Sequence, residues 1–192
     1  APISTIDSTL QTNATAILES KLSEINAQSG QVIVMEVQSG QIKALVGLTR
    51  KDSANYQSCE NFSVWQSTGL MHPISLLAAL ETGKVKLSDK VDTGNGIYQI
   101  HGRELKDHNW HRGGYGELTV QEGLAASSNI AIYKTMEKAF GDNPQTFFDL
   151  LTNMSYGKPD SINGIASLQP YKITEKNITW NCIGYEQLIS PI

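Results

Sequence analysis

The spacing of hydrophobic residues changes from helical to alternating within the first fifty positions. Apolar residues at 10–25 recur every three or four positions after a run of capping side chains, which predicts an amphipathic helix over 4–26. Two β-rich runs follow at 31–37 and 42–48, on either side of a glycine-containing turn. The pattern therefore predicts one helix followed by a β-hairpin.

Helical spacing dominates beyond residue 50, and no further strand is expected there. Residues 68–82 predict a buried helix that is entered at Pro73 and stopped at Gly83. Residues 94–116 are rich in glycine, histidine and asparagine and predict a loop, and the chain from Ser155 onward is also loop-rich. Three helices with short breaks are predicted at 119–126, 128–140 and 144–152.

This order of elements predicts an α+β fold in a single domain spanning residues 1–192. Residues 1–50 would form the sheet layer, and residues 51–192 a mostly helical lobe with loops. A two-stranded hairpin is marginally stable alone, so its open edge needs a partner. Further strands of a parent protein would supply one, and a sheet-edge dimer through residues 31–48 is the alternative.

Composition narrows the classes of partner. Hydrophobic residues make up 40% of the 192 positions and charged residues 18%, which is typical of a folded globular domain. A net charge of −4 disfavours nucleic-acid binding, because a phosphate backbone needs a basic surface. No stretch approaches the roughly 20 apolar residues of a membrane span, so we expect membrane attachment only through a parent anchor outside this sequence.

Several residues that could support other chemistry are better explained structurally. Glu117 and Glu122 lie on or next to a predicted helix among ordinary polar positions, which favours a solvated face over paired glycosidase carboxylates. Cys59 and Cys182 are too few for a disulfide framework, and burial as thiols is favoured over a single bridge. We expect no metal and no cofactor, although four potential ligands concentrate in one predicted loop, namely His101, Asp107, His108 and His111.

Five segments carry distinctive motifs, in order along nearly the whole chain, namely 5–46, 65–85, 116–131, 154–162 and 183–192. The second contains Gly69-Leu-Met-His72-Pro before an alanine- and leucine-rich helix, and the third ends in Ser127-Ser-Asn129. Together the five segments resemble the landmarks of the penicillin-binding-protein transpeptidase domain. That family has Ser-Thr-Met-Lys-Pro in the second segment and a Ser-x-Asn motif in the third.

The resemblance implies a serine peptidase that acylates itself on the D-Ala-D-Ala end of peptidoglycan stem peptides and is trapped by β-lactams. The family's lysine lies one helical turn after its serine and takes the hydroxyl proton. Here Gly69 occupies the serine position and His72 the lysine position, and no shift of register to Ser67 or Ser75 restores the pair. The family's third motif lies beyond the point at which this sequence stops.

Ser127 and Asn129 have two readings. A Ser/Asn pair at the start of a helix is a common cap, whereas the ordered landmarks favour a motif with an active or vestigial role. Ser155 and Lys158 also form a Ser-x-x-Lys pattern, but in a different landmark, and we treat that match as coincidence.

The expected function is a penicillin-binding-protein-like domain of the bacterial cell envelope, periplasmic or otherwise extracytoplasmic, that does not acylate. Its expected partners are the peptidoglycan stem peptide or other cell-envelope proteins. An active D,D-transpeptidase completed by parts outside this chain is the first alternative, and an interaction module using the hairpin edge is the second. A water molecule activated by His72 is a less favoured route to catalysis.

Overall fold

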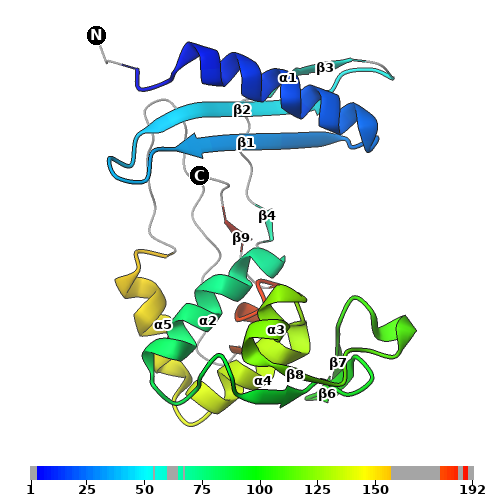
Figure 1. Ribbon diagram of the computed structural model, residues 1–192, viewed down its shortest axis with the longest axis vertical. Coiled ribbons are helices and arrows are strands. Elements are labelled where there is room, and N and C mark those ends of the chain that lie inside the picture. The colour runs from blue at the N-terminus through cyan, green and yellow to red at the C-terminus, as the bar shows by residue number, and fades with distance from the viewer. Residues whose placement is uncertain are drawn as a thin grey trace. The chain divides into compact units, whose positions relative to one another are not determined.

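A computed structural model describes residues 4–53, 55–59, 65–66, 68–156, 178–185 and 188–189 (Figure 1). The chain divides into two compact units. The first comprises residues 1–64 with 190–192, and the second comprises residues 65–189. Helices and strands occur in both units, which agrees with the α+β class.

The first unit is built from one helix and a small sheet. Helix α1 (Ser8–Glu24) begins where Asp7 accepts hydrogen bonds from the N–H groups of Thr9 and Leu10. Leu18 and Leu22 are its buried residues, and they pack on Val46 and Leu48 of the sheet. The predicted helix is confirmed, and it lies along one side of the sheet (Figure 1). Its predicted apolar face is only partly buried, because Leu10, Ile17 and Ile25 are exposed.

The predicted hairpin is also confirmed, and a third strand that was not predicted joins it. Strands β1 (Ser29–Met35) and β2 (Ile42–Arg50) pair antiparallel. Strand β3 (Tyr56–Ser58) pairs with the last three residues of β2, and the sheet order is β1-β2-β3. A strand of three residues carries almost no periodic signal, so the sequence pattern does not predict β3.

Side chains from the N-terminal segment cover the part of β2 that β3 does not reach. The amide of Gln11 donates to the carbonyl of Leu45 and accepts from the N–H of the same residue, both at 2.8 Å. The backbone N–H of Asp7 donates to the carbonyl of Lys43. This edge of β2 is therefore satisfied within the unit, whereas β1 has β2 as its only strand neighbour among the described residues.

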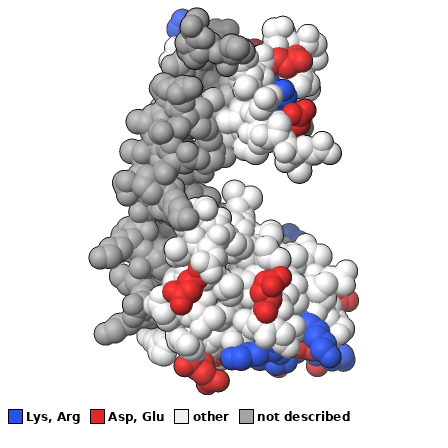
Figure 2. All heavy atoms as spheres, turned by 90° about the vertical axis from the view of Figure 1, so that its left-hand side faces the viewer, with Lys and Arg blue, Asp and Glu red and all other residues white. Residues whose placement is uncertain are grey.

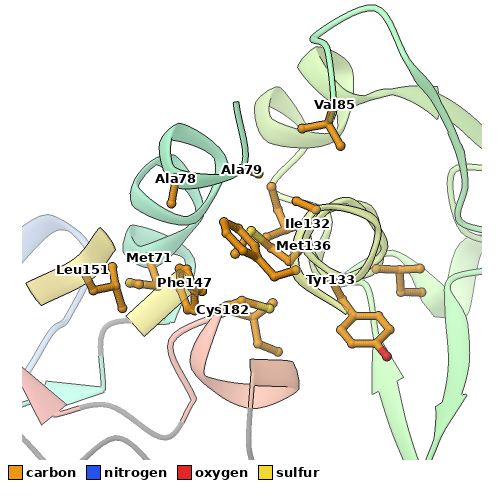
Figure 3. Close-up of a cluster of buried hydrophobic side chains, with 14 of the residues drawn as sticks. Met71, Ala78, Ala79, Val85, Ile132, Tyr133, Met136, Phe147, Leu151 and Cys182 are labelled. Atoms are coloured by element: carbon orange, nitrogen blue, oxygen red, sulfur yellow. The ribbon is translucent and has the colours of Figure 1, made fainter. Parts of the chain in front are cut away.

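The second unit is organised around three helices that meet in one apolar core. Met71 of α2, Met136 of α4 and Phe147 of α5 point into the same cluster, together with Cys182 (Figure 3). Each of these side chains is almost fully buried. The helices of this unit are α2 (Met71–Glu81), α3 (Val120–Ala125), α4 (Asn129–Phe140), α5 (Pro144–Asn153) and α6 (Ile178–Asn181).

The predicted helix ends agree closely with the structure. A 3-10 turn, η1 (Thr68–Leu70), leads into α2, so Pro73 is the third residue of α2 rather than its entry. Helix α3 carries a capping box in which Thr119 and Glu122 bond reciprocally. Within the predicted loop-rich tail, residues 157–177 lie outside the described residues and α6 is helical.

The expectation that no strand follows residue 50 was wrong, and the loop predicted at 94–116 is confirmed only outside residues 97–106. That stretch contains the hairpin of β6 (Ile97–Ile100) and β7 (Arg103–Lys106). His101 and Gly102 form its turn with positive φ angles of 48° and 78°, as a tight two-residue hairpin requires. The other short strands pair as β5 (Lys90–Asp92) with β8 (Glu117–Thr119), and β4 (Trp65–Gln66) with β9 (Leu188–Ile189).

Charged side chains form small separate groups of both signs on the face displayed in Figure 2. In the second unit, Lys138 pairs with Asp89 at 2.8 Å and Lys90 pairs with Glu117 at 2.6 Å. Glu117 is therefore one half of a surface ion pair, and Glu122 is half of the α3 capping box. These two contacts occupy the glutamates that the sequence offered as paired carboxylates.

Candidate functional site

The residues of the candidate site lie at the starts of two helices, α2 and α4. Gly69 lies in η1, and His72 lies in the first turn of α2 with its side chain only 1% exposed. Ser127 precedes α4 and has a positive φ of 51°, a conformation that few non-glycine residues adopt. Asn129 is the first residue of α4.

Asp107 holds the start of α4 in place. Its Oδ2 accepts a hydrogen bond from the Ser128 hydroxyl at 2.8 Å, and its Oδ1 accepts from the backbone N–H of Ile130 at 3.1 Å. Ser128 in turn caps α4 by accepting from the N–H of Ala131 at 3.0 Å. Asp107 and Ser128 are both almost completely buried, so this anchor is part of the folded core.

Ser128 is therefore the residue that caps α4, and the side chains of Ser127 and Asn129 on either side of it make a different contact. Ser127 Oγ lies 3.2 Å from Nδ1 of His72. Nε2 of the same ring lies 3.1 Å from Oδ1 of Asn129. The structure thus brings together His72, Ser127 and Asn129 in one continuous chain of hydrogen bonds.

Further contacts fix the direction of every hydrogen bond in this chain. The Asn129 Nδ2 group donates to the backbone carbonyl of Lys106 at 2.9 Å and lies 3.1 Å from the hydroxyl of Tyr185. Since a carbonyl can only accept, the amide oxygen of Asn129 must be the atom that faces His72. That oxygen also only accepts, so the proton of neutral His72 is assigned to Nε2. Nδ1 then presents a lone pair, and Ser127 donates its hydroxyl proton to it.

Burial lowers the pKa of His72 below its ordinary value of 6.5. The hydrogen bond with Asn129 and the negative charge of Asp107 act in the opposite direction, with smaller effect. The imidazole is therefore neutral at pH 7. A neutral imidazole can accept a proton, but it cannot supply the fixed positive charge of a lysine.

Gly69 faces this pair and has no side chain. A Cβ at this position would lie 3.0 Å from Ser127 Oγ and 3.9 Å from Cε1 of His72. The predicted nucleophile position is thus adjacent to both remaining polar groups, as the sequence motif implies. It provides them with no oxygen atom to activate.

An aromatic stack that sequence reasoning missed borders the site. The ring of Tyr185, whose hydroxyl meets Asn129, stacks on Trp180 with centroids 6.1 Å apart and planes 13° apart. The guanidinium of Arg103 lies 4.3 Å from the centroid of the same Trp180 ring. Tyr185 belongs to the fifth landmark segment, which was the only available signal.

The three histidines in the stretch predicted as a loop, residues 94–116, lie in separate environments. His101 forms the β6–β7 turn, and the His108 ring contacts the hydroxyl of Tyr115, with Nε2 at 3.0 Å. The ring of His111 packs against Trp110. Across the described ranges, no three His, Cys, Asp or Glu side chains converge as a metal site would require.

Both cysteines are free thiols, so the structure contains no bridge between them. Cys182 is fully buried, and burial raises the pKa of its thiol far above the usual range. Cys59 is only partly buried, which differs from the expected burial of both. Lys158, the partner of Ser155 in the coincidental motif, lies outside the described residues.

The mixed helix-and-strand fold, with its small sheets, is similar to that of penicillin-binding-protein transpeptidase domains. One similar structure is the transpeptidase domain of penicillin-binding protein 3 from Burkholderia pseudomallei, with a TM-score of 0.78 at 23% identity. The match covers 99% of this chain and 56% of that one. A second is a peptidoglycan glycosyltransferase from Burkholderia ambifaria, with a TM-score of 0.73 at 26% identity. That match covers 98% of this chain and 57% of the other. These likenesses establish the fold.

The family follows from the sequence comparison. Residues 30–192 match the penicillin binding protein transpeptidase domain, and the chain belongs to that family. Over 140 residues it is 31% identical to penicillin-binding protein 1A of Streptococcus pneumoniae (strain ATCC BAA-255 / R6) and 29% identical to that of Streptococcus oralis. Those matches span 70% of this chain but only 19% and 21% of the two relatives.

No helix in the described parts of the chain has the length and apolar character needed to cross a bilayer.

Proposed function

We propose that this chain is a peptidoglycan-recognition domain of the bacterial cell envelope, in which the family's Ser-x-x-Lys acylation does not operate. It binds the stem peptide at the surface formed by η1 and the start of α4. The observation that carries the proposal is Gly69, which faces Ser127 and His72 but has no side-chain hydroxyl to acylate. The family membership and the names of its relatives support the cell-wall setting.

The loss at position 69 has a large expected effect on turnover. Removal of the nucleophile from a well-studied serine enzyme lowers turnover by about six orders of magnitude. His72 does not compensate for this loss, because a base beside position 69 finds no hydroxyl there from which to take a proton.

Polar groups suited to binding remain at the site. The side chains of Ser127 and Tyr185 are exposed, and each carries a hydroxyl that can pair with a peptide amide. Asn129 is held between Lys106 and His72, so its orientation is set before a ligand arrives. These features favour a domain that retains recognition without the family's covalent step at position 69.

The test combines binding and turnover of one ligand. A peptide ending in D-Ala-D-Ala is titrated calorimetrically into the protein, and the release of free D-Ala is followed in parallel. We expect saturable binding without release. Asp142→Ala, a change at an exposed position between α4 and α5 and outside the proposed binding surface, serves as a control that should leave binding unchanged. Release of D-Ala by the unchanged protein, or failure of the peptide to bind, would contradict the proposal.

A further inference from the structure

We propose that Ser127, His72 and Asn129 form a serine–histidine–asparagine triad in which Ser127 accepts an acyl group from an activated ester. This goes beyond the proposed function, which concerns binding and the empty nucleophile position at residue 69. The order of contacts is that of a nucleophile, a base and a residue that orients the base.

Ser127 has the accessibility and the backbone conformation of a reactive residue. Its side chain is exposed, whereas His72 behind it is 1% exposed. An acyl donor can therefore reach the hydroxyl while the base stays shielded from water. The positive φ of 51° is a strained conformation of the kind that folded proteins retain at functional sites.

The base is set in the correct protonation state and tautomer. Asn129 Oδ1 accepts a hydrogen bond from Nε2–H of His72, and Asn129 Nδ2 donates to the Lys106 carbonyl. Nδ1 is thereby left as the acceptor for Ser127. Relative to the familiar serine hydrolase arrangement the two ring nitrogens exchange roles, but either nitrogen can act as the base. The 3.2 Å separation of Oγ and Nδ1 is within the looser range typical of such pairs without substrate.

The absence of a side chain at Gly69 keeps the space beside Ser127 Oγ open. A Cβ there would approach Oγ to 3.0 Å, closer than ordinary contact, so the hydroxyl would have to move by a few tenths of an ångström. The same change that removes one candidate nucleophile therefore gives room to another.

The reaction balances without any further reagent. Ser127 Oγ attacks the ester carbonyl carbon, and its proton passes to Nδ1 of His72. The tetrahedral intermediate expels the leaving-group oxygen, which takes the proton from His72, and an acyl ester of Ser127 remains. Water then attacks this ester by the same route, releases the carboxylic acid and regenerates the serine. Esters with good leaving groups are the substrate class, because their expulsion requires little protonation.

The experiment uses p-nitrophenyl acetate for rates and a fluorophosphonate as a trap that stays on the serine. We expect the fluorophosphonate to add once, at Ser127 by peptide mapping. Ser127→Ala should abolish this adduct and lower ester turnover by about 100-fold or more. Ser155→Ala is the matched control, because Ser155 is an exposed serine of the same unit with a similar φ of 61°. It should change neither readout.

Two further variants test the mechanism rather than the mere presence of a hydroxyl. His72→Gln should lower the rate by about 100-fold and remove the rise in rate that accompanies deprotonation of the imidazole. Gly69→Ala should slow labelling by crowding Oγ, whereas Asp142→Ala, at an exposed position between α4 and α5, should not. Thermal melts verify that each variant is folded.

The outcomes separate this inference from the proposed function. Labelling at another residue, or equal ester turnover by Ser127→Ala and the unchanged protein, would overturn the triad and leave the binding proposal intact. Release of D-Ala from the peptide by a protein that labels normally at Ser127 would overturn the binding proposal alone. Loss of the rate in His72→Gln without a change in the pH profile would also overturn the triad, since His72 would then have only a structural role.

Discussion

Replacing Asp107 by alanine tests whether the start of α4 depends on one buried carboxylate. Asp107 is 1% exposed and accepts from the Ser128 hydroxyl and from the Ile130 N–H. Both donors are buried, and each would lose a charged acceptor. Leaving a buried donor unsatisfied costs about 1–3 kcal/mol, so the two together predict a loss of about 2–6 kcal/mol in the free energy of unfolding. That is a large part of the roughly 5–15 kcal/mol that stabilises a typical domain.

The assay is urea denaturation followed by the helical circular dichroism signal. The midpoint should fall without a change in slope, because the surface exposed on unfolding stays the same. Asp107→Asn keeps an oxygen for Ile130, so we expect a smaller loss of about 1 kcal/mol. Asp142→Ala, at an exposed position in the same unit, should have little effect. A loss for Asp107→Ala no greater than for Asp142→Ala would refute the anchoring role.

The remaining predictions concern the core, a helix cap and pH. Phe147→Ala should lower stability by about 3–5 kcal/mol, measured by denaturation, because its ring is fully buried among the three core helices. Thr119→Ala should cost about 1 kcal/mol by removing the capping box with Glu122; an unchanged melting temperature would exclude that role. The lowered pKa of His72 means that the unfolded chain binds its proton more readily, so stability is full above pH 6.5 and falls as the pH drops toward the folded-state pKa. His72→Gln should flatten this slope in denaturation curves recorded across pH, and an unchanged slope would place the effect elsewhere.

Elements defined by local interactions were accessible from the sequence. The α3 start combines Thr119 with Glu122 three residues later, and both partners of that capping box lie within one helical turn. In α1 and in the β1–β2 hairpin, the spacing of apolar residues follows the helical and strand periods, and this spacing can be recognised without knowing which segments pack against them. Their prediction needed no tertiary contact.

The short strands of the second unit were not accessible in this way. Asp92 pairs with Glu117, far along the chain, and strands of three or four residues are too short to show alternation. The β6–β7 turn uses His101 before Gly102, whereas Asn-Gly and Asp-Gly are the pairs that usually mark a tight hairpin. These elements exist because of the partners they meet.

The sequence by itself determined the fold class, the family and the identity of the residues at the motif positions, including Gly69 and His72. Only the tertiary structure decided what those residues can do together. His72 meets Ser127 and Asn129 across 55 and 57 positions of sequence, and the carbonyl of Lys106 orients the amide that fixes the imidazole proton. A proton's position depends on the direction of each neighbouring donor and acceptor, and those directions arise only when distant segments pack.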